Sequence, residues 1–429
     1  MVRRKWIALL RWSEKYTQTD MVYVMHGGLL LLLGKAGLLS ILALVMFFFA
    51  NWLPPATYGA YEYILTIMVL FGIFSLPGLN TALVRSIAKK KEGSLALILK
   101  TKLKWSLLGS LGMFAIAAWY IYKEQSLLGI AIGIGGAFLP FYTVFPMFEA
   151  YWNGKKRFDV KIKYEIAVAF LAALCIIPTL YFTDNIAVIL FVFFSSYTVL
   201  NGFFLWRTLQ QVQNREEDAE GIHLGKSLTG IIAIWTLAEY ADKIILWKFL
   251  GPAQLAIYAF AAQPLQRIIA FNPMGALVLP KVSESNTKQT YANLKKKFFK
   301  SFAVTLPIAT GLALLAPFPY RIFFPQYMDS VIYFQALSVL IAMAPFVLIN
   351  TALVVEMRKK ELYIVNVAKA VIKIGLYLPL VPLLGIWGIV TGRIVGNVVA
   401  NILLFYFFTK IGREHEIQKN LHASEEQGG

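Results

Sequence analysis

Four basic residues lie within stretches of sequence that are otherwise apolar and long enough to cross a membrane: Arg267, Lys369, Lys373 and Arg393. A charged side chain costs about 2.5–3.5 kcal/mol at the centre of a membrane helix, so such residues usually face a wet interior or a partner. Lys369 and Lys373 are four residues apart and share one helix face. Arginine binds phosphate groups in bidentate fashion, so a cavity with these walls would suit an anionic head group such as a pyrophosphate.

Five further charged residues are candidates for the same region. Lys35 lies about two helical turns into the first apolar stretch, where it can either snorkel to the membrane surface or face a cavity. Arg85 follows the second apolar stretch. Glu239 and Lys243 are four residues apart and can pair locally, with Asp242 beside them. This trio is a candidate for ion coupling or for structural pairing.

The buried cations need a compensating anion. The predicted helices that carry Arg267, Lys369, Lys373 and Arg393 contain no carboxylate of their own. Two sources remain open. The anion comes either from a ligand or from carboxylates on other predicted helices, namely Glu62, Glu149, Glu239 and Asp242.

The composition is typical of an integral membrane protein. Hydrophobic residues make up 58% of the 429 residues and charged residues 15%, whereas soluble proteins are about 45–50% apolar and about 25% charged. The net charge of +18 is clustered beside apolar stretches, which favours cytoplasmic membrane loops over a nucleic-acid partner. The single cysteine, Cys175, excludes an intrachain disulfide and a cysteine-based metal site. We expect no cofactor and no metal.

The apolar stretches predict an all-α membrane fold with twelve transmembrane helices. Six fall in each half of the chain, so the two halves enter the membrane from the same side, which predicts two parallel repeats related by an axis along the membrane normal. The predicted spans are 29–50, 60–80, 105–122, 127–151, 164–182, 186–206, 227–249, 254–280, 298–318, 331–355, 362–384 and 386–408.

Lysine and arginine residues concentrate in alternate predicted loops, and the opposite set of loops contains only Lys123 and Arg321. The positive-inside rule therefore predicts a multi-pass protein of the cytoplasmic membrane with both termini in the cytoplasm. Residues 1–28 are expected to form a cytoplasmic amphipathic segment that binds anionic lipid. Bundles at 29–206 and 227–408 are expected to be joined by a flexible polar linker at 207–226 and followed by a disordered cytoplasmic tail at 409–429.

Small residues recur at helical spacing in the last predicted span. Gly388, Gly392 and Gly396 lie four residues apart, as do Gly129 and Gly133 in the fourth span. This spacing allows helix backbones to approach closely, and we expect the contacts to be intramolecular.

One short motif occurs twice, 197 positions apart. Leu53-Pro-Pro-Ala-Thr-Tyr-Gly-Ala-Tyr61 and Leu250-Gly-Pro-Ala-Gln-Leu-Ala-Ile-Tyr258 share leucine, proline, alanine and tyrosine at identical positions. Both copies follow one apolar stretch and precede another. The recurrence indicates a duplicated helix–turn–helix unit, one in each half.

These two motifs, together with Gly78-Leu-Asn-Thr-Ala-Leu-Val-Arg-Ser-Ile-Ala88 and Ala241-Asp-Lys-Ile-Ile-Leu246, resemble bacterial polysaccharide-biosynthesis membrane proteins. These are the O-antigen-type lipid-linked oligosaccharide flippases of the multidrug/oligosaccharidyl-lipid/polysaccharide exporter superfamily. The first copy departs from the usual Leu-Gly-Pro by having Pro54, and the second has Ala256 where glycine is common. Arg85 and Asp242 match family positions.

The resemblance implies two pseudo-symmetric six-helix bundles around a central cavity. It also implies alternating access and export of an undecaprenyl-pyrophosphate-linked glycan for cell-surface polysaccharide and lipopolysaccharide synthesis. A glycan polymerase or ligase is a further candidate partner. We expect no enzymatic activity, because the sequence has no Walker A motif, no H-E-x-x-H motif and no long outer loop. A cation-coupled multidrug antiporter of the same superfamily is the alternative, although its cavity should be acidic rather than basic.

Overall fold

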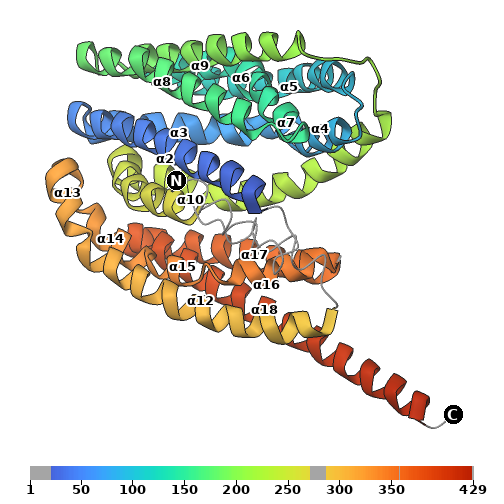
Figure 1. The fold of residues 1–429 in the computed structure, drawn as a ribbon. Helices are drawn as coiled ribbons and strands as arrows, with labels where there is room; N and C mark the ends of the chain where they lie inside the picture. Colours follow the sequence, from blue (N-terminus) through green and yellow to red (C-terminus); the bar gives the residue numbers. More distant parts are fainter. Residues whose placement is uncertain (1–20, 271–286, 357, 428–429) are drawn as a thin grey trace, which may run out of the picture. The chain divides into compact units, whose positions relative to one another are not determined.

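A computed structural model describes residues 21–270, 287–356 and 358–427, and all of their regular secondary structure is helical (Figure 1). This confirms the predicted all-α membrane fold. Within the described ranges, ten helices are long and apolar enough to cross a membrane, or eleven if one bent pair counts as a single span. The chain is therefore a multi-pass membrane protein, and the count of twelve spans stays a prediction.

The chain divides into two compact units, residues 1–234 (unit 1) and 235–429 (unit 2). In unit 1, the 3₁₀ turn η1 (Gly72–Ser75) follows α3, and η2 (Phe145–Met147) joins α6 to α7. Its helices are α2 (Met21–Trp52), α3 (Pro55–Phe71), α4 (Gly78–Ala88), α5 (Ser94–Tyr122), α6 (Ser126–Val144), α7 (Phe148–Gly154), α8 (Phe158–Phe182), α9 (Ile186–Leu209) and the start of α10 (Ala219–Ala270).

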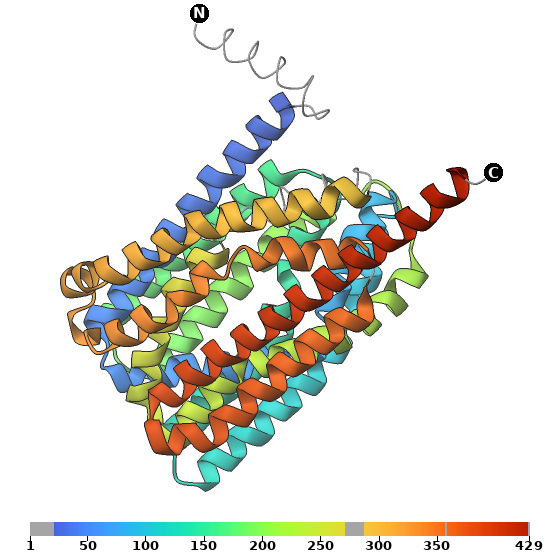
Figure 2. The same cartoon turned by 90° about the horizontal axis from the view of Figure 1, so that it is seen from below.

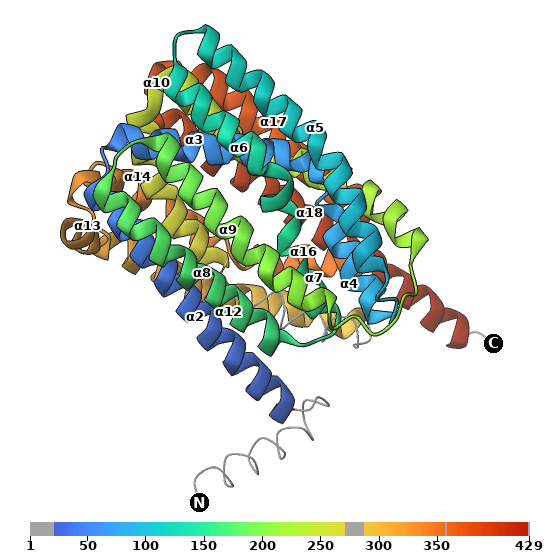
Figure 3. The same cartoon turned by 90° about the horizontal axis from the view of Figure 1, so that it is seen from above.

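Glycines set the helix spacing of unit 1. Figure 3 shows α2 running beside α8, and a Cβ added at Gly34 would fall 2.2 Å from a side-chain carbon of Ile162 on α8. Similarly, a Cβ at Gly129 of α6 would fall 2.8 Å from the carbonyl oxygen of Ala117 on α5. Both helix pairs therefore require a residue without a side chain at the contact.

Unit 2 contains the rest of α10 and the helices that follow it. These are α12 (Thr287–Leu315), α13 (Pro317–Phe323), α14 (Ser330–Leu337), α15 (Val339–Ala342), α16 (Phe346–Val355), α17 (Lys359–Leu384) and α18 (Ile386–Gln427), with the 3₁₀ turn η3 (Pro325–Tyr327). The predicted span 331–355 is not one straight helix, because the α14–α15 segment and α16 meet at 48°. Pro345 immediately precedes α16 and cannot continue the hydrogen bonding of the segment before it.

Helices α17 and α18 lie side by side along their length (Figure 2). A Cβ at Gly388 would fall 2.5 Å from the carbonyl oxygen of Leu380, and one at Gly392 would fall 2.8 Å from the ring of Tyr377. A Cβ at Gly396 would fall 2.6 Å from Cγ of Lys373. The glycines of α18 thus form the contact with α17, which confirms the prediction of close intramolecular packing.

The second copy of the repeated motif breaks α10. Gly251 has φ 80° and ψ −176° inside an otherwise helical segment, a conformation that residues with a side chain rarely adopt. In the first copy Pro54, with φ −58° and ψ 141°, precedes α3, which begins at Pro55. The two copies therefore make their turns with different backbone conformations.

Two predictions about the connecting segments were wrong. The last helix continues to Gln427, so residues 409–427 are helical rather than disordered; after Gly412 they include no proline and no glycine that would end a helix. The region 207–226 was expected to be a flexible linker, but α10 begins at Ala219 and residues 210–218 are hydrogen-bonded to other residues of unit 1, as described below.

Residues 1–20 of the predicted amphipathic segment lie outside the described residues, and residues 21–28 belong to α2.

The close packing of α18 against α17 can be tested with two glycine-to-alanine substitutions. We expect Gly396→Ala to lower the unfolding temperature of the detergent-solubilised protein, because the new Cβ meets a side-chain carbon of the buried Lys373 at 2.6 Å. Gly375→Ala on α17 is the control, since a Cβ there meets nothing within 4 Å. Alanine in a helix is favoured over glycine by about 0.5–1 kcal/mol, so the control should be neutral or stabilising. Equal effects of the two changes would contradict the packing account.

Candidate functional site

Unit 2 contains a buried cluster of four charged side chains and one tyrosine, here called the ion cluster: Glu239, Asp242, Lys373, Arg393 and Tyr258. Glu239 and Asp242 are three residues apart on α10 and therefore share a helix face. Lys373 comes from α17 and Arg393 from α18. The ion cluster therefore joins three helices, α10, α17 and α18, through charged side chains that lie within apolar stretches.

The guanidinium of Arg393 is the centre of the ion cluster. Its Nη2 lies 2.7 Å from Oε1 of Glu239, and its Nη1 lies 3.1 Å from Oδ2 of Asp242. The same Nη1 donates a 2.7 Å hydrogen bond to the Tyr258 hydroxyl, which in turn donates to Oδ2 of Asp242. Lys373 binds the second oxygen of Glu239, Oε2, at 2.9 Å. Every ionised group of the ion cluster is thus paired and hydrogen-bonded, as burial in an apolar interior requires.

The break at Gly251 makes this arrangement possible. Asp242 and Tyr258 are 16 residues apart, which in a straight helix would separate them by about 24 Å. Because the backbone turns at Gly251, the second part of α10 returns toward the first, and the Tyr258 hydroxyl contacts Asp242. The repeated motif therefore positions a tyrosine against the carboxylate that precedes it.

The structure identifies the counter-ions of two predicted cations. The sequence left open whether the anion comes from other helices or from a ligand, and for Lys373 and Arg393 it comes from Glu239 and Asp242 on α10. Lys373 is 1% exposed and Arg393 6% exposed. Their charges are therefore neutralised within unit 2 itself.

Lys369 differs from these two residues. It lies one turn before Lys373 on α17, half-buried, and electrostatically it is influenced by Glu239, Lys373 and Arg393. Among the described residues it has no ion pair and no hydrogen bond through its ammonium group. Two carboxylates face two paired cations, so Lys369 gives this region a surplus positive charge.

The structure also places four other predicted site residues. Arg267 is half-buried in the last turn of α10. Lys243 donates its backbone N–H to Oδ1 of Asp242, and its ammonium group lies 5.7 Å from the centre of the Tyr240 ring. Lys35 on α2 and Arg85 in the last turn of α4 are exposed side chains of unit 1. No group of three or more metal-ligating side chains suitable for a metal ion occurs in the described part of the chain.

Lys102 was not among the predicted site residues, because it lies between the predicted spans 60–80 and 105–122. Helix α5 already begins at Ser94, and Lys102 is 1% exposed, with its ammonium group 2.6 Å from the amide oxygen of Asn80. A signal was present in the chain. Buried positions recur every four residues along this helix: Ser94, Ile98, Lys102, Ser106 and Ser110. Tyr258 was also missed as a site residue, although the repeated motif singled it out.

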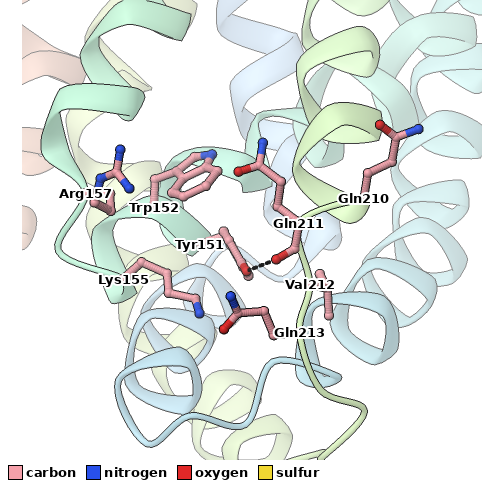
Figure 4. Close-up of a pocket in the computed structure, with 8 residues that line it drawn as sticks. All are labelled: Tyr151, Trp152, Lys155, Arg157, Gln210, Gln211, Val212 and Gln213. Atoms are coloured by element: carbon pink, nitrogen blue, oxygen red, sulfur yellow. Dashed lines mark hydrogen bonds between the residues drawn. The ribbon is translucent and has the colours of Figure 1, made fainter.

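A second polar cluster holds the segment 210–218 against unit 1. The buried Glu92 pairs with Lys155 and accepts hydrogen bonds from the Tyr151 hydroxyl at 2.8 Å and from the Gln213 backbone N–H at 2.9 Å. Tyr151 also approaches the carbonyl oxygen of Gln211 at 3.3 Å (Figure 4). Beside these residues is a cavity of about 410 Å³, which Trp152 and Arg157 also line.

Asp218 anchors the other end of this segment. Its backbone N–H donates to the Ser94 hydroxyl at 2.9 Å, and its carboxylate accepts from the Ser86 hydroxyl at 3.1 Å. Lys91 lies 3.7 Å and Lys89 3.9 Å from the same carboxylate. We call Glu92, Asp218 and these partners the linker clamp. It explains why the segment is ordered although its composition is polar.

Both carboxyl groups of the linker clamp have lowered pKa values. Burial alone would raise the pKa of Glu92, but the hydrogen bonds and charge of Lys155, with the Gln213 N–H and the Tyr151 hydroxyl, lower it below its usual range. Burial likewise opposes the lowered pKa of Asp218, which results from Ser86, Lys91 and Lys89. The linker clamp is therefore stabilising above the ordinary carboxyl range, and this stabilisation is lost as the pH falls through the lowered pKa values.

We expect Arg393→Gln to lower the stability of the protein strongly. Removing one partner of a buried ion pair leaves an uncompensated charge and costs about 3–5 kcal/mol, and here Glu239 and Asp242 both lose a partner. Lys369→Gln is the control, because Lys369 forms no ion pair in the described structure, and its unfolding temperature should stay near that of the wild type. Thermal unfolding in detergent measures both. A wild-type unfolding temperature for Arg393→Gln would contradict the ion cluster.

The linker clamp can be followed with a spin label at Arg215→Cys in a Cys175→Ser background, because Arg215 is exposed on the clamped segment. We expect Glu92→Gln to make the label more mobile at neutral pH, and acidification to have the same effect on the otherwise unaltered protein. Glu217→Gln is the control, since Glu217 is exposed on the same segment and should leave label mobility unchanged. A mobile label at neutral pH with Glu92 intact would show that the segment is not held.

The described fold is similar to several solved membrane transporters. The lipid II flippase MurJ in an inward closed conformation has a TM-score of 0.69 at 11% identity, covering 92% of this chain and 91% of that one. A multidrug resistance MATE family transporter of the MOP superfamily, inward-facing, has a TM-score of 0.66 at 15% identity, covering 87% and 94%. A MOP superfamily transporter from Pyrococcus furiosus Vc1 has a TM-score of 0.60 at 15% identity, covering 90% and 95%. These similarities show that the chain has the fold of the MOP superfamily transporters.

No curated protein matches the chain. A family model described as "Polysaccharide biosynthesis protein" matches residues 25–286, which is more than half of the sequence and includes both copies of the repeated motif. The match agrees with the resemblance inferred from those motifs. The chain is therefore a member of the polysaccharide biosynthesis protein family of membrane proteins.

Proposed function

We propose that the protein is a flippase that moves a polyprenyl-pyrophosphate-linked oligosaccharide from the inner to the outer leaflet of the bacterial cytoplasmic membrane, by alternating access. The glycan would serve cell-surface polysaccharide synthesis, with undecaprenyl pyrophosphate as the carrier. The family membership and the similarity to a lipid II flippase both support a lipid-linked saccharide as the substrate. The transporter fold also supports translocation rather than catalysis.

The observation that carries the proposal is the surplus positive charge at Lys369. The ion cluster neutralises Glu239 and Asp242 internally, so the ammonium group of Lys369 is available to an anionic substrate. A pyrophosphate is attracted to such a group, because an unpaired charge in a region of low dielectric interacts strongly with an opposite charge. We propose that Lys369 contacts the substrate directly in unit 2.

The remaining candidate residues either contact the substrate or hold the helices in place in this proposal. Arg267 in unit 2, and Lys35 and Arg85 in unit 1, are proposed to contact phosphate or acidic sugars directly. Lys373 and Arg393 are buried and paired, so they are proposed to act by holding α10, α17 and α18 together around Lys369. Glu239, Asp242 and Lys243 are then proposed as structural partners rather than ion-coupling groups.

The alternative is a cation-coupled multidrug antiporter, which the similarity to MATE structures supports. A binding region for organic cations should present unpaired carboxylates, whereas both carboxylates of this region are paired with cations. For the similar Pyrococcus furiosus transporter, reverse polarity of the binding pocket has been taken to suggest a different function. In this chain, the surplus positive charge of Lys369 favours the flippase.

We expect a strain that lacks the protein to accumulate a polyprenyl-pyrophosphate oligosaccharide, measured by mass spectrometry of its lipids. The wild-type gene should remove the accumulation and Lys369→Gln should not, because the amide cannot bind phosphate as an ion pair. Lys369→Arg should restore part of the activity, since it keeps the charge. Lys360→Gln on the same helix is the control, because Lys360 is exposed at the start of α17, and it should complement fully.

Membrane levels of each variant must match the wild type, which an epitope-tag blot establishes. Full complementation by Lys369→Gln at normal levels would contradict the role of Lys369. A deletion strain without lipid accumulation, but with increased sensitivity to cationic dyes, would instead support the antiporter.

A further inference from the structure

Unit 1 contains a cavity of about 330 Å³ that is lined by residues of α2, α6, α7, α8 and α9. Leu38 and Leu42 of α2 and Val168 of α8 make part of it apolar. The polar residues that line it belong to the other helices. They are Tyr142, Glu149, Glu165, Tyr197 and Asn201, and we call this set the acid pocket.

Two carboxyl groups line the acid pocket together. Glu149 lies in the first turn of α7 and Glu165 about two turns into α8. Both side chains line the same cavity, and the charge of Glu165 acts on Glu149. A hydrogen bond between two carboxyl groups requires that one of them carries a proton, because an ionised carboxylate only accepts. If both were ionised, two like charges would face each other in a half-buried site, which is unfavourable.

The neighbouring charges favour a single proton. Lys161 lies one turn before Glu165 on α8, with its ammonium group 3.4 Å from Oε1 of Glu165. One proton on the pair leaves one carboxylate, which Lys161 balances. Without the proton the three groups carry a net negative charge, and with two protons a net positive charge. The lining residues of α2 are leucines, while α6 and α9 contribute the phenols of Tyr142 and Tyr197.

Asn201 supplies an independent indication of a ligand. It lies on α9, is 5% exposed and lines the acid pocket. Its side-chain amide forms no hydrogen bond with another residue of the described structure, although buried polar groups are normally hydrogen-bonded. The amide of Asn201 lines the same cavity as Glu149 and Glu165 and can donate a hydrogen bond to the carboxylate that forms when a proton leaves.

We propose that Glu149 and Glu165 form a proton-binding site that holds one proton between their carboxyl oxygens. Release breaks the O–H bond of the protonated carboxyl group and transfers the proton to a water molecule, which becomes hydronium and leaves two carboxylates. Lys161 and Asn201 then stabilise the added negative charge. Resting on the proposed transport function, this site is where a proton is taken up or released during the transport cycle.

The test is infrared spectroscopy of the purified full-length protein in lipid nanodiscs, recorded as a function of pH. We expect a protonated carboxyl band at neutral pH that disappears at alkaline pH. Glu149→Gln and Glu165→Gln should each abolish the titrating band. Asp159→Asn is the control, because Asp159 is an exposed carboxylate on the same helix that pairs with Arg157, and it should keep the band unchanged.

A further variant separates a proton site from a structural contact. Lys161→Gln should move the loss of the band to higher pH, because the doubly ionised pair loses its positive neighbour. This shift does not depend on the transported substrate, so it can succeed or fail independently of the flippase proposal. Glutamine has nearly the shape of a protonated glutamate, and an unchanged unfolding temperature would show that each glutamine variant is folded.

Three results would overturn the proposal. The first is the absence of a titrating carboxyl band in the wild type. The second is a band that survives both glutamine substitutions. The third is a band that disappears when sodium replaces choline at constant pH, because that result would assign the acid pocket to a metal cation instead of a proton.

Discussion

A carboxylate or an ammonium group inside an apolar helix bundle needs an opposite charge within a few ångströms, and unit 2 is arranged around this requirement. Arg393 binds both Glu239 and Asp242, and Lys373 binds the remaining oxygen of Glu239. Because the partners come from α10, α17 and α18, charge neutrality ties these helices together. In the proposed flippase, substrate recognition depends on Lys369, the cation that this pairing leaves without a carboxylate partner in the described structure, rather than on the more deeply buried Arg393.

Close helix packing is what brings these partners within reach. Gly388, Gly392 and Gly396 let α18 approach α17, and the stem of Lys373 passes over Gly396 before its ammonium group reaches Glu239. The glycine spacing and the ion pair are therefore two parts of one arrangement: a larger residue at 396 would displace the side chain that neutralises the carboxylate. Membrane helices gain little from the hydrophobic effect on association, so small contacts and polar pairs carry much of the specificity.

The apolar stretches and the glycine spacing were sufficient to predict the fold class, since both are properties of single helices. Partners that lie far apart along the chain were harder to predict. The pairing of Glu239 with Lys373 joins residues 134 positions apart, whereas the sequence suggested the local neighbour Lys243. Asp218 lies in the predicted linker and Glu92 lies between two predicted spans, where polar residues are typical. Both residues are held by contacts with distant parts of the chain, Asp218 by Ser86 and Ser94 and Glu92 by Tyr151. Tail disorder was wrongly inferred from polarity alone.

The turn residues of the two motif copies, Pro54 and Gly251, cannot replace one another without a change of backbone conformation. Pro54 has φ −58° where the second copy has Gly251 at φ 80°, and proline is restricted to φ near −65°. A change of Gly251 to proline would require a different backbone path, and the Tyr258 hydroxyl would then no longer be directed at Asp242. The recurrent motif thus keeps its leucine, proline, alanine and tyrosine positions while its turn residue differs between the copies. A single mutation at this position in the second copy would therefore not restore the turn of the first copy.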